Sequence, residues 1–385
     1  MLKIGERVVS PEDLEPFLSQ PWCGIDLHWH ARDFEHWRKD TLRHSLQIAY
    51  AAGLAAVGAM PNTSPPLTTL DLCKAYLSVA DQTGVPIQLF VHIGLTPDVE
   101  QVKRAVEATR KNPRIIGMKA YWGRSTGDLG IIREDQQYAV WETLAKEGYE
   151  GVIVGHYEEE FFLGDARFKR ESPKTWSTRS RPESAEIASF HKNTYAADSV
   201  KYKGKIHVAH VSTVHVVDEI CRINDANSAH HFSALKGRMT CGITPHHWIF
   251  NSDVMDGPDG LEYKCNPALR EELIRERLKA YFFEERIPIG ESDHAPHSEE
   301  DKHGKDVASG IPGGSAWPYV VALMRLLDMP EDRLKRVTFD TALKLHNLQD
   351  RVEYKPRVPD LERLAELQRG YHFDAFKELK TSATR

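Results

Sequence analysis

Cys23-Gly24-Ile25-Asp26-Leu27-His28-Trp29-His30 decides the fold, because this apolar run is typical of a buried β-strand and ends in two histidines. Residues two apart in a strand point to the same side, so His28 and His30 can face one metal ion together. Imidazole suits zinc and similar ions. Arg32 follows at the same spacing and offers a planar fork for a carboxylate. The stretch indicates a metal site beside an acidic substrate, although two histidines alone are more often structural.

Seven further strand-like runs follow, and most of them end beside polar residues. The runs cover residues 55–60, 86–93, 115–118, 151–155, 206–209, 239–243 and 288–292. Amphipathic segments lie between them, at 69–80, 98–109, 134–146, 183–193 and 271–284. Alternation of this kind predicts a parallel sheet, and eight units predict an α/β fold, a (β/α)8 TIM-like barrel. In such barrels the chemistry lies at the carboxyl ends of the strands, where these polar residues stand.

Composition narrows the class of protein. The chain has 385 residues, a formal charge of -6 and 28% charged residues, with no basic block that would favour nucleic acid. No apolar stretch reaches membrane length, and the first residues do not read as a signal peptide. Five scattered cysteines without a CxxC pair favour free thiols and a cytoplasmic setting. We expect residues 1–23 as an N-terminal extension, 24–348 as the barrel and 349–385 as a C-terminal helical extension.

Several motifs resemble those of dihydroorotases, a family of the amidohydrolase superfamily. They include His28-Trp29-His30-Ala31-Arg32-Asp33, Gly117-Met118-Lys119-Ala120-Tyr121 and Asp293-His294-Ala295-Pro296-His297. Further matching segments are residues 60–66, 181–186, 207–213, 264–270 and 309–314. Arg32 and the Met60-Pro61-Asn62-Thr63 stretch distinguish dihydroorotases from hydantoinase-like relatives. Many relatives add a β-sandwich domain from both chain ends. Here we expect a barrel with short extensions and no full sandwich.

The resemblance implies a role for each candidate residue. It implies two divalent ions, zinc first among them, and an N6-carboxylated Lys119 that bridges them. The metal ligands it implies are His28, His30, Lys119, His156, His210 and Asp293. The substrate-binding residues it implies are Arg32, Asn62, Asn266 and His297. The acidic residues after His156, at 158–160, are expected to form a solvated turn.

The reaction implied is the reversible closure of N-carbamoyl-L-aspartate to L-dihydroorotate in pyrimidine biosynthesis, through a hydroxide that bridges the metals. Asp293 would be the catalytic acid and base. Another cyclic-amide hydrolase, such as a hydantoinase or allantoinase, would not need Arg32. A non-catalytic scaffold for aspartate transcarbamoylase would be expected to have lost ligands. A small-molecule substrate is expected, without nucleic acid or membrane. A homo-oligomer and an aspartate transcarbamoylase partner both stay open.

Overall fold

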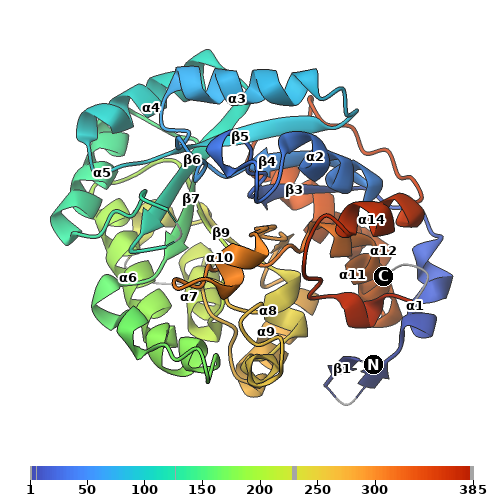
Figure 1. The fold of residues 1–385 in the computed structure, drawn as a ribbon. Helices are drawn as coiled ribbons and strands as arrows, with labels where there is room; N and C mark the ends of the chain where they lie inside the picture. The colour runs from blue at the N-terminus through green and yellow to red at the C-terminus, as the bar shows by residue number, and fades with distance from the viewer. Residues whose placement is uncertain (1, 6, 126, 228–231, 382–385) are drawn as a thin grey trace.

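The computed structural model describes residues 2–5, 7–125, 127–227 and 232–381, and its centre is an eight-stranded parallel sheet. The strands are β3 (Gly24–Trp29), β4 (Leu54–Ala59), β5 (Gln88–Gly94), β6 (Ile115–Trp122), β7 (Val152–Tyr157), β8 (Lys205–Val208), β9 (Met239–Ile243) and β10 (Ile289–Gly290). Each strand pairs with the next in sequence. A parallel bridge between Trp29 and His294 joins the first strand to the segment after the last. The predicted (β/α)8 barrel is therefore confirmed (Figure 1).

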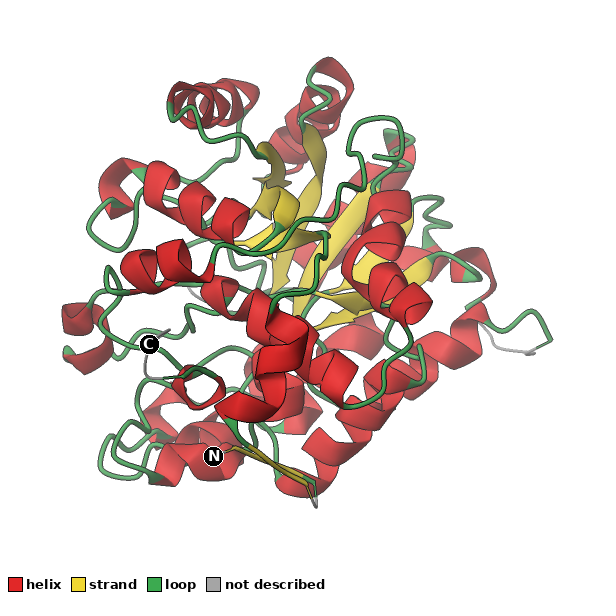
Figure 2. Ribbon diagram, turned by 90° about the vertical axis from the view of Figure 1, so that its right-hand side faces the viewer, coloured by secondary structure: helices red, strands yellow, loops and turns green. Residues whose placement is uncertain are grey.

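Helices surround the sheet and alternate with its strands (Figures 1 and 2). The α-helices are α1 (Pro11–Leu18), α2 (Leu42–Ala51), α3 (Leu70–Gln82), α4 (Val99–Lys111), α5 (Glu134–Lys146), α6 (Glu183–Ser199), α7 (Val214–Asn224), α8 (Pro245–Ile249), α9 (Glu272–Phe283), α10 (Glu299–His303), α11 (Trp317–Leu326), α12 (Glu331–Lys335), α13 (Thr341–Leu345) and α14 (Leu361–Gln368). The single-turn helices are Phe34–His36, Glu160–Phe162, Asp165–Arg167, Trp176–Ser180, Ser233–Leu235, Ser252–Asp256, Gly314–Ala316, Arg336–Asp340 and Lys377–Leu379. No helix of the described residues is long and apolar enough to cross a membrane.

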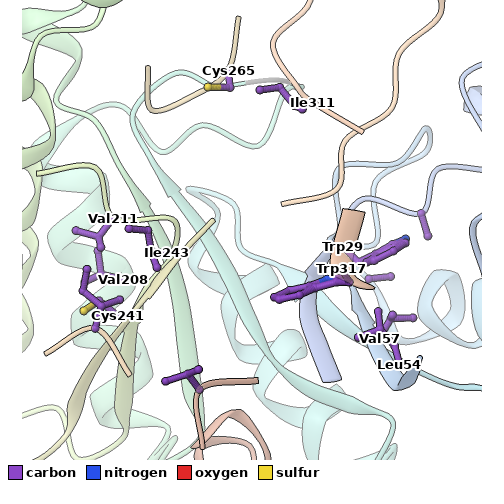
Figure 3. Packing of buried hydrophobic residues seen from close by; sticks show 14 of the residues in the cluster. Trp29, Leu54, Val57, Val208, Val211, Cys241, Ile243, Cys265, Ile311 and Trp317 are labelled. Carbon is purple, nitrogen blue, oxygen red and sulfur yellow. The ribbon is translucent and has the colours of Figure 1, made fainter. Parts of the chain in front are cut away.

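Two clusters of buried apolar side chains form the core of the barrel. The larger cluster lies between strands and helices, where Val208, Val211, Cys241 and Ile243 pack together (Figure 3). The smaller cluster includes strand residues such as Ile25 and the buried helical residues Phe339, Leu343 and Leu345. Close-packed side chains fill such barrels rather than leave a pore. The polar groups accordingly gather at the carboxyl ends of the strands.

The two chain ends form short extensions. Strands β1 (Leu2–Ile4) and β2 (Arg7–Val9) pair as an antiparallel hairpin, which is the one sheet outside the barrel among the described residues. Helix α1 packs on α11, and α14 packs on α2. Helix α14 lies within the segment expected as a C-terminal helical extension. The long connections 164–181 and 298–314 contain short helices, including α10.

Candidate metal centre and active site

One cavity collects almost all of the predicted site residues. Its wall comes from the ends of strands that are far apart in sequence. The lining residues are His28, His30, Arg32, Asn62, Lys119, Tyr121, Ser125, His156, His210, Asn266, Asp293, Ala295, Ser309 and Gly310. Every predicted metal ligand is in this set, and His297 is the only predicted substrate residue outside it. The spacing reasoning did not single out Tyr121, Ser125, Ser309 or Gly310 for the cavity, although all but Ser125 lie in matching motifs.

The backbone turns sharply where the strands reach the cavity. Arg32, His210 and Asp293 have φ values of 55°, 39° and 47°, in the left-handed region that non-glycine residues rarely occupy. Such strained residues cluster at functional sites when the surrounding structure holds them. Strand β3 ends at Trp29, so the alternation of a strand does not extend to Arg32, although Arg32 lines the same cavity as His28 and His30. Arg32 reaches the cavity through this turn instead.

His28, His30 and Asp293 form the first ligand group. Asp293 Oδ1 lies 2.9 Å from His30 Nε2 and 3.3 Å from His28 Nε2. Burial lowers the pKa of His30 to about 4, so its ring is neutral at pH 7. Burial alone would raise the pKa of Asp293, but hydrogen bonds from His28 and His30 outweigh it and hold that pKa well below its usual range. The group thus offers an ionised carboxylate and at least one neutral imidazole.

His156, His210 and Lys119 form the second group. His156 Nδ1 lies 3.3 Å from His210 Nε2. Burial lowers the pKa of both histidines, and that of His210 falls well below its ordinary value. Lys119 is 0% exposed, and its Nζ has no hydrogen-bond partner among the described residues. Burial lowers the pKa of Lys119 to about 8, although Asp293 and Glu291 oppose this. A substantial fraction of this amine is therefore neutral near pH 8.

These donors fit divalent metal ions. Two ligands at about 2.0–2.1 Å from a tetrahedral zinc lie roughly 3.3 Å apart. The separations between His28 and Asp293 and between His156 and His210 are both 3.3 Å. Ligand atoms of His28, His30 and Asp293 also lie within 4.8 Å of one another. Metal binding requires neutral imidazoles and ionised carboxylates. Burial favours the neutral ring of His30, and the hydrogen bonds from His28 and His30 keep Asp293 ionised.

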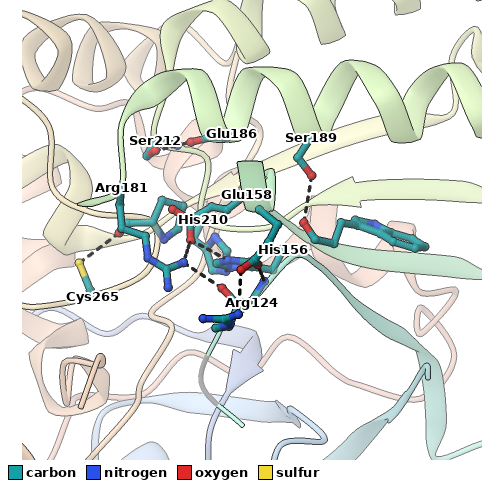
Figure 4. Close-up of polar contacts among 12 residues, drawn as sticks. Arg124, His156, Glu158, Arg181, Glu186, Ser189, His210, Ser212 and Cys265 are labelled. Carbon is teal, nitrogen blue, oxygen red and sulfur yellow. Dashed lines mark hydrogen bonds and ion pairs between the residues drawn. The ribbon is translucent and has the colours of Figure 1, made fainter. Parts of the chain in front are cut away.

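Glu158 lies behind His156 and is fully buried, so the expectation of a solvated turn at residues 158–160 was wrong for this residue. Its Oε2 lies 2.9 Å from His156 Nε2 and accepts a hydrogen bond of 2.6 Å from Arg181 Nη1 (Figure 4). Burial alone would raise the pKa of Glu158, but Arg181 and His156 outweigh it and lower that pKa to about 2. An ionised Glu158 draws the His156 proton to Nε2 and leaves Nδ1 free as a ligand atom.

Glu291 supports the first group in a similar way. Its Oε2 lies 3.4 Å from His28 Nδ1 and 3.3 Å from His207 Nε2, and its Oε1 accepts from the backbone N–H of His210. Burial alone would raise the pKa of Glu291, but His28 and His207 hold it well below its ordinary value. The sequence reasoning did not assign a role to Glu291, and its place two residues before Asp293 was the available signal.

The predicted substrate residues differ in how openly they face the cavity. Arg32 is 3% exposed, and its Nε donates to the Pro296 carbonyl at 3.0 Å. The side-chain oxygen Oδ1 of Asn62 lies 2.5 Å from His30 Nδ1, so Asn62 also orients the ring of His30, a candidate metal ligand. Asn266 Oδ1 is buried without a partner among the described residues. His297 Nε2 lies 3.2 Å from Arg32 Nη2 and thus touches Arg32 from outside the lining.

A parallel barrel that gathers histidines, a lysine and an aspartate at its strand ends defines a metal-dependent hydrolase barrel of the amidohydrolase type. No family model matches the chain. The dihydroorotase of Thermococcus kodakarensis is 31% identical over 348 residues, which cover 90% of this chain and 72% of that protein. The dihydroorotase of Pyrobaculum aerophilum is 29% identical over 310 residues, 79% of this chain and 66% of that protein. The chain belongs to the dihydroorotase family.

Solved structures agree on the fold. The L-hydantoinase of Arthrobacter aurescens superposes with a TM-score of 0.71 at 20% identity, over 86% of this chain and 72% of that one. The dihydroorotase of Saccharomyces cerevisiae, solved with 5-fluoroorotic acid, superposes with a TM-score of 0.66 at 18% identity, over 86% of both chains. The present chain spans only 66% to 72% of the length of the two curated relatives.

Proposed function

We propose that this chain is a dihydroorotase, which interconverts N-carbamoyl-L-aspartate with L-dihydroorotate and water in pyrimidine biosynthesis. The observation that carries the proposal is one cavity in which four histidines, a buried lysine and an aspartate meet a buried arginine. The histidines, the lysine and the aspartate suit the binding of metal ions for hydrolysis. Metal chemistry does not require the arginine, which offers a cation to a substrate that carries a carboxylate.

His28, His30 and Asp293 would hold one divalent ion, and His156 and His210 would hold a second. Lys119 lines the same cavity, and a carbamate formed from its neutral amine and carbon dioxide, with release of a proton, would bridge the two ions. We propose zinc, since nitrogen and oxygen donors of this kind suit it. When bound, the ions would supply Lewis acidity, which polarises a carbonyl and lowers the pKa of water.

The chain's own residues bind the substrate and move its proton. Arg32 would hold the carboxylate common to substrate and product, and His297 would fix the guanidinium from behind. The Asn266 amide, whose Oδ1 has no partner among the described residues, would accept from a ring N–H. Asp293 is ionised at neutral pH, so during ring opening it could take the proton of the attacking water and pass it to the leaving amide nitrogen. During ring closure the same proton would move in the opposite direction.

The decisive experiment compares wild type with Arg32→Met on a charged and a neutral ring. On dihydroorotate the variant should lose roughly 2–5 kcal/mol of transition-state stabilisation, since a buried charge pair would be broken. On the neutral ring dihydrouracil the loss should be much smaller. Equal losses on both rings would show that Arg32 supports the barrel rather than the substrate. The equilibrium between the two compounds depends on pH. Ring closure turns a dianion into a monoanion and consumes a proton, so acidic pH should favour dihydroorotate.

Two other functions make different demands on the chain. A hydantoinase would act on neutral rings and would lose nothing specific in Arg32→Met. A non-catalytic partner of aspartate transcarbamoylase would show no cyclisation when metal-loaded. The complete ligand set in one cavity favours an active enzyme over this second candidate. We place the enzyme in the cytoplasm, a reducing compartment in which the five unpaired cysteines would stay reduced. Size-exclusion chromatography with light scattering, alone and with aspartate transcarbamoylase, tests whether it forms a homo-oligomer or that complex.

A further inference from the structure

Glu262, His303 and His372 form a second cluster outside the candidate active site. Glu262 lies in the segment before the 264–270 motif, His303 ends α10, and His372 follows α14. Glu262 Oε1 lies 2.7 Å from His303 Nε2, and its Oε2 lies 3.0 Å from His372 Nε2. Three segments distant in sequence are therefore joined through one carboxylate.

The carboxylate of this cluster lacks a conventional counter-charge. Glu262 is only 4% exposed, and no lysine or arginine side chain among the described residues forms an ion pair with it. The nearby Lys302 ammonium is directed to backbone carbonyls, including that of Glu262 at 2.9 Å. Burying a carboxylate is costly unless it is paired or coordinates a metal. Among the described residues, the side chains that contact the Glu262 carboxylate within 4 Å as ion-pair partners are the imidazoles of His303 and His372. Imidazole is a common ligand for transition metals.

We propose that Glu262, His303 and His372 bind a divalent transition-metal ion, with zinc the best match. One ligand atom from each residue already lies within 4.8 Å of the other two. The ion would take the place of the two imidazole protons that now face the carboxylate, and two nitrogens and one oxygen would bind it. The His303 side chain is 50% exposed, so water can reach a fourth position.

Such an ion would fasten one wall of the candidate active site. Lys264 lies two residues after Glu262, and its backbone carbonyl accepts a hydrogen bond of 2.9 Å from the Gly310 N–H. Gly310 in turn lines the cavity of the candidate active site. Gly310 has a φ of 152°, and a Cβ there would lie 2.7 Å from the Ala295 carbonyl oxygen, so a side chain at this position would not fit. The ion would tie this wall to α10 and to the C-terminal segment.

Zinc stoichiometry at equilibrium tests the proposal. Wild type and three variants are stripped with a chelator, dialysed to equilibrium against micromolar free zinc and analysed for bound metal. Glu262→Gln and His303→Gln should each bind one zinc fewer per chain than wild type. Lys377→Gln is the matched control, because Lys377 pairs with Asp259 at 2.8 Å and links the same two segments without offering a metal ligand to this cluster. It should bind as much zinc as wild type.

Crystals of the zinc-loaded wild type give the second measurement. An anomalous peak at the zinc edge between Glu262, His303 and His372 is expected. Equal zinc in all four proteins together with no such peak would overturn the proposal and leave a hydrogen-bonded triad only. Because the readout is a difference between variants, it does not depend on how many ions the barrel centre holds or on whether the protein turns over dihydroorotate.

Discussion

Glu158→Gln is the sharpest test of how the candidate metal centre is organised. The substitution keeps the size of the side chain and removes its negative charge. In wild type, Glu158 Oε2 lies 2.9 Å from His156 Nε2 and 2.6 Å from Arg181 Nη1, and all three side chains are nearly or fully buried. With glutamine, His156 is no longer forced to carry its proton on Nε2. Arg181 loses the negative charge of Glu158, which is its buried ion-pair partner.

The magnitudes follow from these contacts. Removing one partner of a buried pair destabilises a protein by about 3–5 kcal/mol, because a charge is left uncompensated. Glutamine can still accept from Arg181, so we expect the lower part of that range, about 3 kcal/mol in the free energy of unfolding. Groups that orient a metal-binding histidine typically change metal affinity 10–100-fold. We expect that loss for the ion held by His156 and His210, with a smaller change for the other ion.

Two assays separate the effects. Chelator competition measures the affinity of each ion, and urea unfolding of the metal-free protein measures stability. Glu160→Gln is the matched control, since it removes the same charge two residues away. Glu160 pairs with the exposed Arg124 at 3.1 Å, and such surface pairs contribute about 0–1 kcal/mol. The control should be close to wild type in both assays.

The reasoning fails if Glu158→Gln binds both ions as tightly as Glu160→Gln does. A loss of stability with unchanged metal affinity would assign Glu158 a purely structural role beside Arg181. Weakened binding of both ions to the same extent would contradict the specific link to His156.

Three further variants test the remaining assignments. Lys119→Ala should lose most activity and at least one bound ion, and short carboxylic acids should restore part of the activity by occupying the space of the missing carbamate; normal metal content and turnover would refute the bridge. Asp293→Asn should slow turnover by roughly 10²–10⁴-fold while substrate still binds, because an amide cannot accept the proton; metal content measured on the same sample separates this from simple loss of the ion. Glu291→Gln should weaken the ion at His28 while leaving that at His156 unchanged, and chelator competition would show the reverse pattern if the assignment is wrong.

Much of the barrel could be predicted because its signals are local. A buried strand is recognisable as a short apolar run, and five amphipathic segments that can cover the strands lie between the eight runs. The helix expected at 134–146 has those bounds in the structure, and the one expected at 183–193 continues to Ser199. That extension carries little amphipathic pattern. Helix ends without strong stop signals are where sequence reasoning is weakest.

The candidate site was predictable in its membership but less so in its geometry. Histidines, lysine and aspartate at strand ends could be named, since parallel strands bring those ends together. The orientation of Arg32 could not, because three consecutive residues from Arg32 to Phe34 adopt positive φ, and no sequence rule requires that of these residue types. Glu158 was misjudged because an acidic run is usually solvated, and only the tertiary structure brings Arg181 against it.

The buried carboxylates orient the histidines of the candidate metal centre. Asp293 faces the cavity, whereas Glu158 and Glu291 each lie beside the outer nitrogen of a histidine that points into it. Each of these outer acids favours a proton on the far side of its ring and a lone pair on the cavity side. Glu158 is paired with Arg181, but the ion-pair partners of Asp293 and Glu291 among the described residues are histidines alone. The buried Lys119 amine has no hydrogen-bond partner among those residues. Without metal ions, burial penalises this arrangement. The free energy of metal binding would offset that cost, so we expect folding of the strand ends around the cavity to be coupled to metal binding.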